Sequence, residues 1–270
     1  MSQVQKIIKY CAIGFALFLV VNIVGGIFFG LAAVGSFFDR NEQKVSMNDL
    51  EVLKIEQGNY NELDIDVASS SIVIKEGDTF KVETNNKYIR VSSEENILEI
   101  EEKEHFINNT ENTVVIYIPV DYSFNEVSID GGAGKVEVEK LTTKDISLDL
   151  GAGKVEFDSL IVTGDADIDG GAGAMEINSG VINNLDLDMG VGKVTMKVKL
   201  TGNNDIDAGV GELDVRLEGT DTEYMIRVNK GIGEAKINGK SVSNNTTYGT
   251  GSNKVLIDGG VGNIIIDFSE

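Results

Sequence analysis

Aspartates that recur at a nearly constant spacing are the residues of this chain most able to do chemistry. They stand two residues before successive Gly-x-Gly phrases, at Asp130, Asp149, Asp169, Asp188, Asp207 and Asp258. If the phrases stack as strands, these side chains form a ladder of carboxylates about 4.8 Å apart. Carboxylate oxygens are ligands for hard cations such as calcium, so this aspartate ladder is a candidate cation site.

Like charges on adjacent strands repel, so something must offset the repulsion within the ladder. Solvent and salt can do so, and bound calcium is a second possibility. Lys135, Lys154 and Lys193 follow the glycines of three phrases and are candidate counter-charges. As a fourth alternative, each aspartate accepts hydrogen bonds from backbone N–H groups of its own turn. We favour turn capping or a solvated surface over cation binding, and we assign no metal ligand and no cofactor.

Residue types needed for catalysis are scarce. The chain has one histidine, His105, and one cysteine, Cys11, so a Ser-His-Asp triad is not expected. The Gly-x-Gly phrases lack the third glycine of a dinucleotide-binding loop, and acidic residues flank them. A uniform ladder offers no two carboxyl groups whose surroundings would separate their pKa values, as acid–base catalysis requires. We therefore predict that the chain is not an enzyme.

Seven repeats, each built around a Gly-x-Gly phrase, must position the ladder. Their first glycines follow one another after 19, 20, 19, 19, 22 and 29 residues, and a period near 20 residues is typical of stacked-repeat folds. We predict that each glycine pair forms a structural turn. These glycines are Gly132, Gly134, Gly151, Gly153, Gly171, Gly173, Gly190, Gly192, Gly209, Gly211, Gly231, Gly233, Gly260 and Gly262.

Apolar and polar residues alternate on both sides of each glycine pair, which predicts two short strands per repeat. Three residues before the first glycine, successive repeats carry Ile129, Leu148, Ile168 and Leu187. One repeat cannot bury this apolar row alone, whereas stacked repeats build a continuous core. The predicted fold is all-β: a single-stranded β-solenoid, or β-helix, of coils of about 20 residues, each laid on the coil before it.

The solenoid is predicted to span residues 61–270, with irregular strands over 61–126 and regular coils over 127–270. Glu62 to Lys75 is a degenerate repeat in which Ala68 replaces the first glycine. We expect the irregular strands to cap one end of the stack. The other end, at Ile264 to Phe268, shows no cap in the sequence, although open strand edges favour aggregation.

An uncharged segment precedes the solenoid. Residues 10–38 carry no charged side chain and are long enough to cross a bilayer, which predicts one N-terminal transmembrane helix. Lys6 and Lys9 lie within residues 1–9, which are therefore predicted to be cytoplasmic, with the C-terminal domain outside the cell. Residues 39–60 are predicted to form a juxtamembrane linker and a first strand. A small-residue run just before residue 37 leaves signal-peptide cleavage as the alternative.

The formal net charge of −21 restricts the partners of the chain. Nucleic acid is excluded, because its phosphates would be repelled. The predicted contacts are the membrane, through residues 10–38, and an envelope or membrane-protein partner. The single cysteine cannot form an intrachain disulfide.

Three features carry a family resemblance: ELDIDVASSSIVIKEG at 62–77, VVIYIPVDYSF at 114–124, and the recurring Asp-x-Gly-x-Gly phrases. Together they resemble the bacterial putative-adhesin family, a β-strand-repeat domain of unknown function in envelope proteins. The resemblance covers roughly residues 50 to 270. It implies a β-helix on a membrane anchor, in some members beside envelope-stress signalling systems of Gram-positive bacteria. It supplies no catalytic residues.

These observations predict a non-catalytic, membrane-anchored and extracytoplasmic β-solenoid that binds or scaffolds at the bacterial cell envelope in an adhesin-like role. Two alternatives stay open. One is an accessory regulator or sensor of an envelope-stress signalling system, and the other is a calcium-stabilised surface module.

Overall fold

The computed structural model describes residues 50–94, 96–103 and 112–269. The predicted cytoplasmic residues 1–9, the predicted transmembrane segment 10–38 and most of the linker 39–60 lie outside the described residues, as does His105. No helix within the described part of the chain is long and apolar enough to span a membrane.

The described chain is all-β, which confirms the predicted fold class, and its only helix among these residues is the short 3-10 helix η2 (Asp221–Glu223). The irregular part contains β1 (Glu51–Leu53), β2 (Glu62–Val67), β3 (Ser71–Gly77), β4 (Lys81–Thr84), β5 (Ile89–Glu94), β6 (Ile97–Glu102) and β7 (Thr113–Pro119). The regular coils contain β8 (Phe124–Val138), β9 (Leu141–Phe157), β10 (Leu160–Val162), β11 (Ala166–Ile177), β12 (Gly180–Asn183), β13 (Leu185–Thr201) and β14 (Asn203–Glu218). The last part contains β15 (Tyr224–Asn229), β16 (Ile232–Ile237), β17 (Lys240–Ser241), β18 (Thr246–Tyr248) and β19 (Asn253–Ser269).

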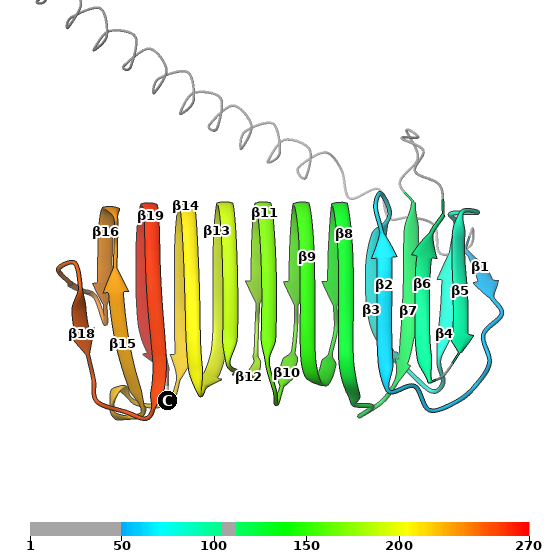
Figure 1. The fold of residues 1–270 in the computed structure, drawn as a ribbon, viewed down its shortest axis with the longest axis horizontal. Coiled ribbons are helices and arrows are strands. Elements are labelled where there is room, and N and C mark those ends of the chain that lie inside the picture. The colour runs from blue at the N-terminus through cyan, green and yellow to red at the C-terminus, as the bar shows by residue number, and fades with distance from the viewer. Residues whose placement is uncertain (1–49, 95, 104–111, 270) are drawn as a thin grey trace, which may run out of the picture. The chain divides into compact units, whose positions relative to one another are not determined.

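Successive coils stack in parallel register to form a solenoid (Figure 1). Ile129 pairs with Leu148, Leu148 with Ile168, and Ile168 with Leu187. All four side chains are buried, as are Val136, Val155, Met175 and Val194 after the glycines. The predicted aliphatic column is therefore confirmed. Burial of apolar surface between these rows is the main term that stabilises such a stack.

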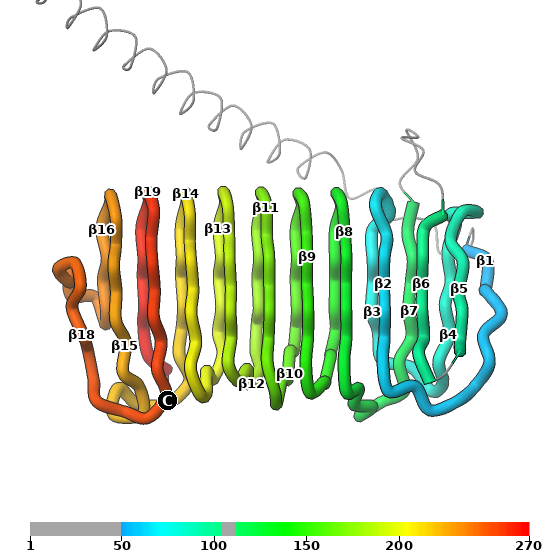
Figure 2. The backbone as a smooth tube through the Cα atoms, in the orientation of Figure 1, coloured from blue at the N-terminus to red at the C-terminus, as the bar shows by residue number. Residues whose placement is uncertain are grey.

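The Gly-x-Gly phrases lie inside continuous strands rather than between two short ones. β8, β9, β11, β13, β14 and β19 each run through their phrase without a break. The prediction of two separate strands per coil is wrong here, because pairing between coils continues through the bend, as where Ala152 pairs with Ala133 and Ala172. Figure 2 shows the chain turning back on itself at one edge of the stack. The residues of a coil before and after this bend are termed its first leg and its second leg.

The bend requires glycine for two reasons. The second glycine of each phrase has a positive φ, for example 157° at Gly153 and 152° at Gly262, which L side chains rarely adopt. The backbones of neighbouring coils also meet there. A Cβ atom on Gly153 would lie only 1.9 Å from the carbonyl oxygen of Gly134. A side chain at this position would therefore push two coils apart.

The coils do not follow sequence order at the C-terminal end. β19, which carries the Gly260 phrase, pairs with β14 on one edge and with β15 and β16 on the other. The last coil in the sequence thus lies inside the stack, and the Gly231 coil lies outside it (Figure 1). The prediction that each coil lies on the one before it is wrong here. The 22-residue step before Gly231 includes residues 219–223, which must pass across the width of β19, and the 29-residue step after Gly231 includes β17 and β18.

Antiparallel strands cover both ends of the described stack. At the N-terminal end β5 pairs with β6, β4 with β7, and β1 with β4. At the C-terminal end β17 pairs with β16, and β18 with β15. The expectation of an uncapped end at Ile264 to Phe268 is wrong, because β19 is paired along both of its edges. Short antiparallel edge strands limit the pairing of a sheet with foreign chains.

The degenerate repeat is part of the stack as predicted. Asp66 pairs with Asp130, and Ile72 pairs with Val136. Its bend has no glycine and is held by Glu102, which is only 4% exposed. The Glu102 carboxylate accepts hydrogen bonds from the backbone N–H and the hydroxyl of Ser69, both at 2.9 Å, and from Asn86 Nδ2 at 2.7 Å. Buried charge is tolerated when it is bonded in this way.

Candidate functional site

The first legs of the coils present two rows of carboxylates on one face of the stack, termed the acidic face. The inner row is the predicted aspartate ladder, extended at one end by Asp66. Register pairing joins Asp130, Asp149, Asp169, Asp188, Asp207 and Asp258 in that order. The structure therefore brings all six predicted aspartates side by side.

An outer row lies two residues before the inner one on the same face. It consists of Asp64, Asp167, Asp186 and Asp205, with serines in the two coils between Asp64 and Asp167. Strand alternation explains both rows, since buried residues such as Ile168 and Leu187 separate them and point to the opposite side. The outer row was missed from the sequence, although its period-two offset from the ladder could have revealed it.

The inner row lacks direct counter-charges. No aspartate of the ladder makes an ion pair with any described residue. One side-chain hydrogen bond reaches the row, from Asn229 Nδ2 to Asp258 Oδ1 at 2.7 Å. The expected hydrogen bonds from turn N–H groups to these aspartates are not found within the described residues. The ladder is instead solvated, with Asp169, Asp188 and Asp207 exposed.

The predicted lysine counter-charges act on the other face. Lys135 pairs with Glu137, and Lys154 Nζ lies 2.7 Å from Glu156 and 3.7 Å from Glu176. Lys193 continues the pattern, with Nζ 3.2 Å from a carboxylate oxygen of Glu212 on the next coil. Glu137, Glu156, Glu176 and Glu212 of the second legs thus each have a lysine partner, whereas no ion pair among the described residues reaches Asp214, Asp267 or the ladder.

Crowding of like charges alters the ionisation of the acidic face. Partial burial raises the pKa of Asp188, and the charges of Asp207, Asp186, Asp169 and Asp205 raise it further. The pKa of Asp130 is also raised, first by burial and then by Asp66 and Asp149 on the adjacent coils. Both shifts mean that these two carboxyl groups lose their protons less readily in the folded protein than in the unfolded chain. The face therefore favours a positively charged partner.

A third row, at the base of the acidic face, is bonded from coil to coil. Asp165 N donates to Asp145 Oδ1 at 2.9 Å, and Asn184 Nδ2 donates to Asp165 Oδ1 at 2.9 Å. Asn203 N in turn donates to Asn184 Oδ1 at 3.0 Å. These side chains are used to hold the coils together, so the inner and outer rows are the ones available to a partner.

Two open grooves lie on the acidic face. The larger has a volume of about 500 Å³, and its polar lining is Asp165, Asp167, Asn184, Asp186, Asn203, Asn204, Asp205 and Lys254. The smaller has a volume of about 330 Å³ and runs along Asp149, Asp169 and Asp188 beside the glycine bend. Both grooves are open to solvent, and the charged side chains in their linings are aspartates apart from Lys254. Their shape suits an extended partner better than an enclosed small molecule.

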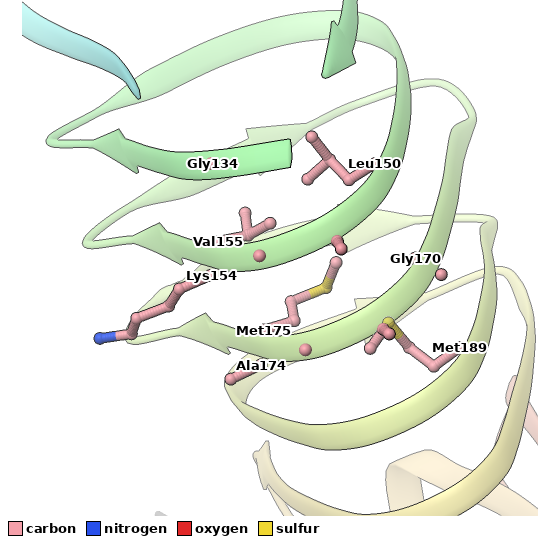
Figure 3. Close-up of a pocket in the computed structure, with 13 residues that line it drawn as sticks. Gly134, Leu150, Lys154, Val155, Gly170, Ala174, Met175 and Met189 are labelled. Atoms are coloured by element: carbon pink, nitrogen blue, oxygen red, sulfur yellow. The ribbon is translucent and has the colours of Figure 1, made fainter. Parts of the chain in front are cut away.

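A separate cavity inside the bend is not a ligand site. The side chains of Leu150, Val155, Met175 and Met189 surround it, beside bare glycine backbone (Figure 3). Its volume is about 20 Å³, which is close to the space of one water molecule, and its walls are apolar. Met189 fills the room left by Gly170, and Leu150 fills the room left by Gly131. A Cβ atom on Gly170 would lie 2.1 Å from the Met189 sulfur.

The ladder does not gather into a metal cluster. Within the described ranges, no three side chains of His, Cys, Asp or Glu come together in a group that could hold a metal ion. The aspartates follow one another in a line, so a cation there would contact carboxylates of neighbouring coils. Cation binding at the ladder stays a prediction.

A family model described as Toastrack DUF4097 matches residues 60–249. No curated protein is significantly similar to the chain. Among solved structures, a putative cell adhesion protein from Clostridium sporogenes ATCC 15579 is 17% identical, with a TM-score of 0.36 over 82% of this chain and 99% of that chain. A putative adhesin from Bacteroides fragilis NCTC 9343 is 15% identical, with a TM-score of 0.28 over 80% and 96% respectively. At these TM-scores the two structures support no inference about function.

Proposed function

The chain belongs to the Toastrack DUF4097 family, which confirms the resemblance predicted from its sequence, and on that premise we propose that it is a non-catalytic binding module of the bacterial cell envelope. The proposed contact surface is the acidic face. The proposed partner is a linear molecule that carries ammonium groups. Residues 10–38 are proposed to anchor the chain in the membrane as a single-pass helix, with the solenoid outside the cell.

The observation that carries this proposal is the charge asymmetry between the two faces. On the second legs, Lys154 forms ion pairs with both Glu156 and Glu176. On the first legs, the ladder from Asp130 to Asp258 has no ion pair among the described residues. Unneutralised rows of like charge lower stability, so their presence on one face only suggests that they serve binding.

The regular spacing of the rows supports a linear partner. Adjacent carboxylates lie about one strand spacing apart, about 4.8 Å, along the whole stack. A polymer with repeated ammonium groups can contact several coils at once, and weak contacts that act together give a high combined affinity. Surface charge pairs are individually weak, so a partner with a single charge would bind poorly.

The proposal excludes turnover of the partner. The carboxylates of the inner row share similar surroundings, whereas acid–base catalysis needs two groups with separated pKa values. Release of products from isolated cell walls by the purified protein would contradict the non-catalytic role.

Two triple variants with equal charge change test the acidic face. The first replaces Asp169, Asp188 and Asp207 with Asn, and the control replaces Glu137, Glu156 and Glu176 with Gln on the other face. Binding to isolated envelopes and to a poly-lysine surface is measured over a range of salt concentrations, after circular dichroism has shown that both variants are folded.

We expect the aspartate variant to lose binding and the glutamate variant to keep it, with binding of the unmodified chain falling as salt rises. Equal binding by both variants, or binding that salt does not change, would rule out the acidic face as the contact surface.

A further inference from the structure

We propose that β19 is an exchangeable strand, and that the slot between β14 and the pair β15 and β16 accepts β19 from a second copy of this chain. The copies then become linked through their C-terminal coils. The starting observation is that the last strand of the sequence is inserted between two coils that precede it.

The slot holds β19 along both edges. On one edge its pairing with β14 runs from Lys254 beside Asn203 to Ser269 beside Glu218. On the other edge it pairs with β15 over Asn253–Asp258 and with β16 from Val261 to Ile266. Backbone bonds outside the strands close the slot, as where Asn238 N donates to Ile266 O at 2.8 Å. β19 thus contributes a complete coil rather than an edge.

Both walls of the slot are built from chain that precedes β19. β14 ends at Glu218, and residues 219–223 carry the chain past the slot into β15. The walls are therefore synthesised before the strand that fills the space between them. Until β19 enters, both walls present unpaired backbone N–H and C=O groups, which attract any suitable strand. A second copy nearby supplies an identical strand, and exchange of identical elements is a low-cost route to association.

Glycine contacts restrict the slot to strands of this repeat. A Cβ atom on Gly262 would lie 1.7 Å from the carbonyl oxygen of Gly211 in β14. A Cβ atom on Gly233 in β16 would lie 1.7 Å from the carbonyl oxygen of Gly262. An occupant must therefore carry a Gly-x-Gly phrase in this register. Among the described phrases, the one in β19 is distinguished because both of its neighbouring coils precede it in the sequence.

The path of β19 suits withdrawal as one unit. The strand begins and ends at the same edge of the stack, opposite its bend (Figure 1). The connection from β18 contains Gly249 and Gly251, and Gly249 has a φ of 77°. This short glycine-containing connection is the proposed hinge. At the far end of the strand, Phe268 packs with ring centroids 5.8 Å from Tyr224 and 6.2 Å from Tyr248, which would receive the same ring from a partner.

Disulfide trapping between two full-length chains tests the exchange. Glu212 in β14 and Asn263 in β19 are register partners, so their Cα atoms are expected about 4.8 Å apart, within the range that a disulfide spans. One chain carries Glu212→Cys and the other Asn263→Cys, each with its own affinity tag and with Cys11→Ser. The chains are co-expressed, oxidised and analysed on a non-reducing gel.

We expect a heterodimer with both tags, in several-fold excess over a matched pairing of Lys135→Cys with Asn263→Cys. Lys135 occupies the same repeat position as Glu212 but lies in β8, several coils away. A heterodimer no more abundant than in this control would overturn the proposal. A chain with both Glu212→Cys and Asn263→Cys must form this disulfide, either within one chain or between two exchanged chains, and failure to form it at all would overturn the strand order on which the exchange depends.

Discussion

Neutralising one aspartate in the middle of the ladder is expected to stabilise the protein. Asp188 lies between Asp169 and Asp207 in register, with carboxylates about 4.8 Å away on each side. Two unit charges at this separation repel by about 0.9 kcal/mol in water, and physiological salt reduces this to about 0.5 kcal/mol. With two such neighbours, Asp188→Asn should raise the free energy of unfolding by about 1 kcal/mol.

The assay is thermal and urea denaturation at neutral pH, with Asp78→Asn as the matched control. Asp78 is exposed after the end of β3, outside the acidic face, and its replacement changes the net charge equally. For a domain of this size, about 1 kcal/mol corresponds to a rise in Tm of about 2–4 °C. The control should change stability by less than about 0.5 kcal/mol.

Salt provides the decisive comparison. In about 1 M salt the screening length falls to about 3 Å, so the advantage of Asp188→Asn should largely disappear. A destabilising effect of Asp188→Asn, or a gain that equals that of Asp78→Asn at every salt concentration, would refute the reasoning. Either result would mean that the ladder charges are already balanced by a bound ion or by a partner group.

Three further predictions follow from the same structure. The pKa of Asp188 is raised in the folded state, so protonation of this carboxyl group stabilises the fold; the stabilisation is present below the unfolded pKa and is lost as pH rises through the folded pKa. When denaturation is measured from pH 7 down to pH 3, the stability advantage of Asp188→Asn should therefore shrink towards zero. An advantage that stays constant with pH would contradict the shift. Gly153→Val should destabilise the protein by about 3 kcal/mol or more, because the new Cβ would lie 1.9 Å from the Gly134 carbonyl oxygen and the φ of Gly153 is positive. Gly58→Val is the control and should be nearly neutral, because no atom lies within 4 Å of a Cβ at that position. Similar urea midpoints for the two variants would exclude the close stacking of bends. If calcium bridges the ladder, the unfolding midpoint should rise with calcium and fall with a chelator; an unchanged midpoint removes the calcium-stabilised alternative.

Local patterns in the sequence were sufficient for the repeat itself. Alternation of apolar and polar residues identified the buried column from Ile129 to Leu187, and the glycine spacing identified the coils. The ladder followed from the same spacing, because residues at equal offsets in stacked coils must lie side by side. These features depend on neighbours within one coil and on a constant period, so they can be read before the fold is known.

Only the tertiary structure decided what depends on pairing between distant segments. The placement of β19 between β14 and β15 reverses the order of two coils that have similar sequences, and either order would bury the same apolar rows. The attachment of Lys154 to Glu156 and Glu176, rather than to the ladder, depends on which leg each side chain occupies. A repeating sequence fixes what each coil buries and exposes, because that depends on local alternation. It leaves open which coil lies beside which, because equivalent edges compete for the same partner and the connections choose between them.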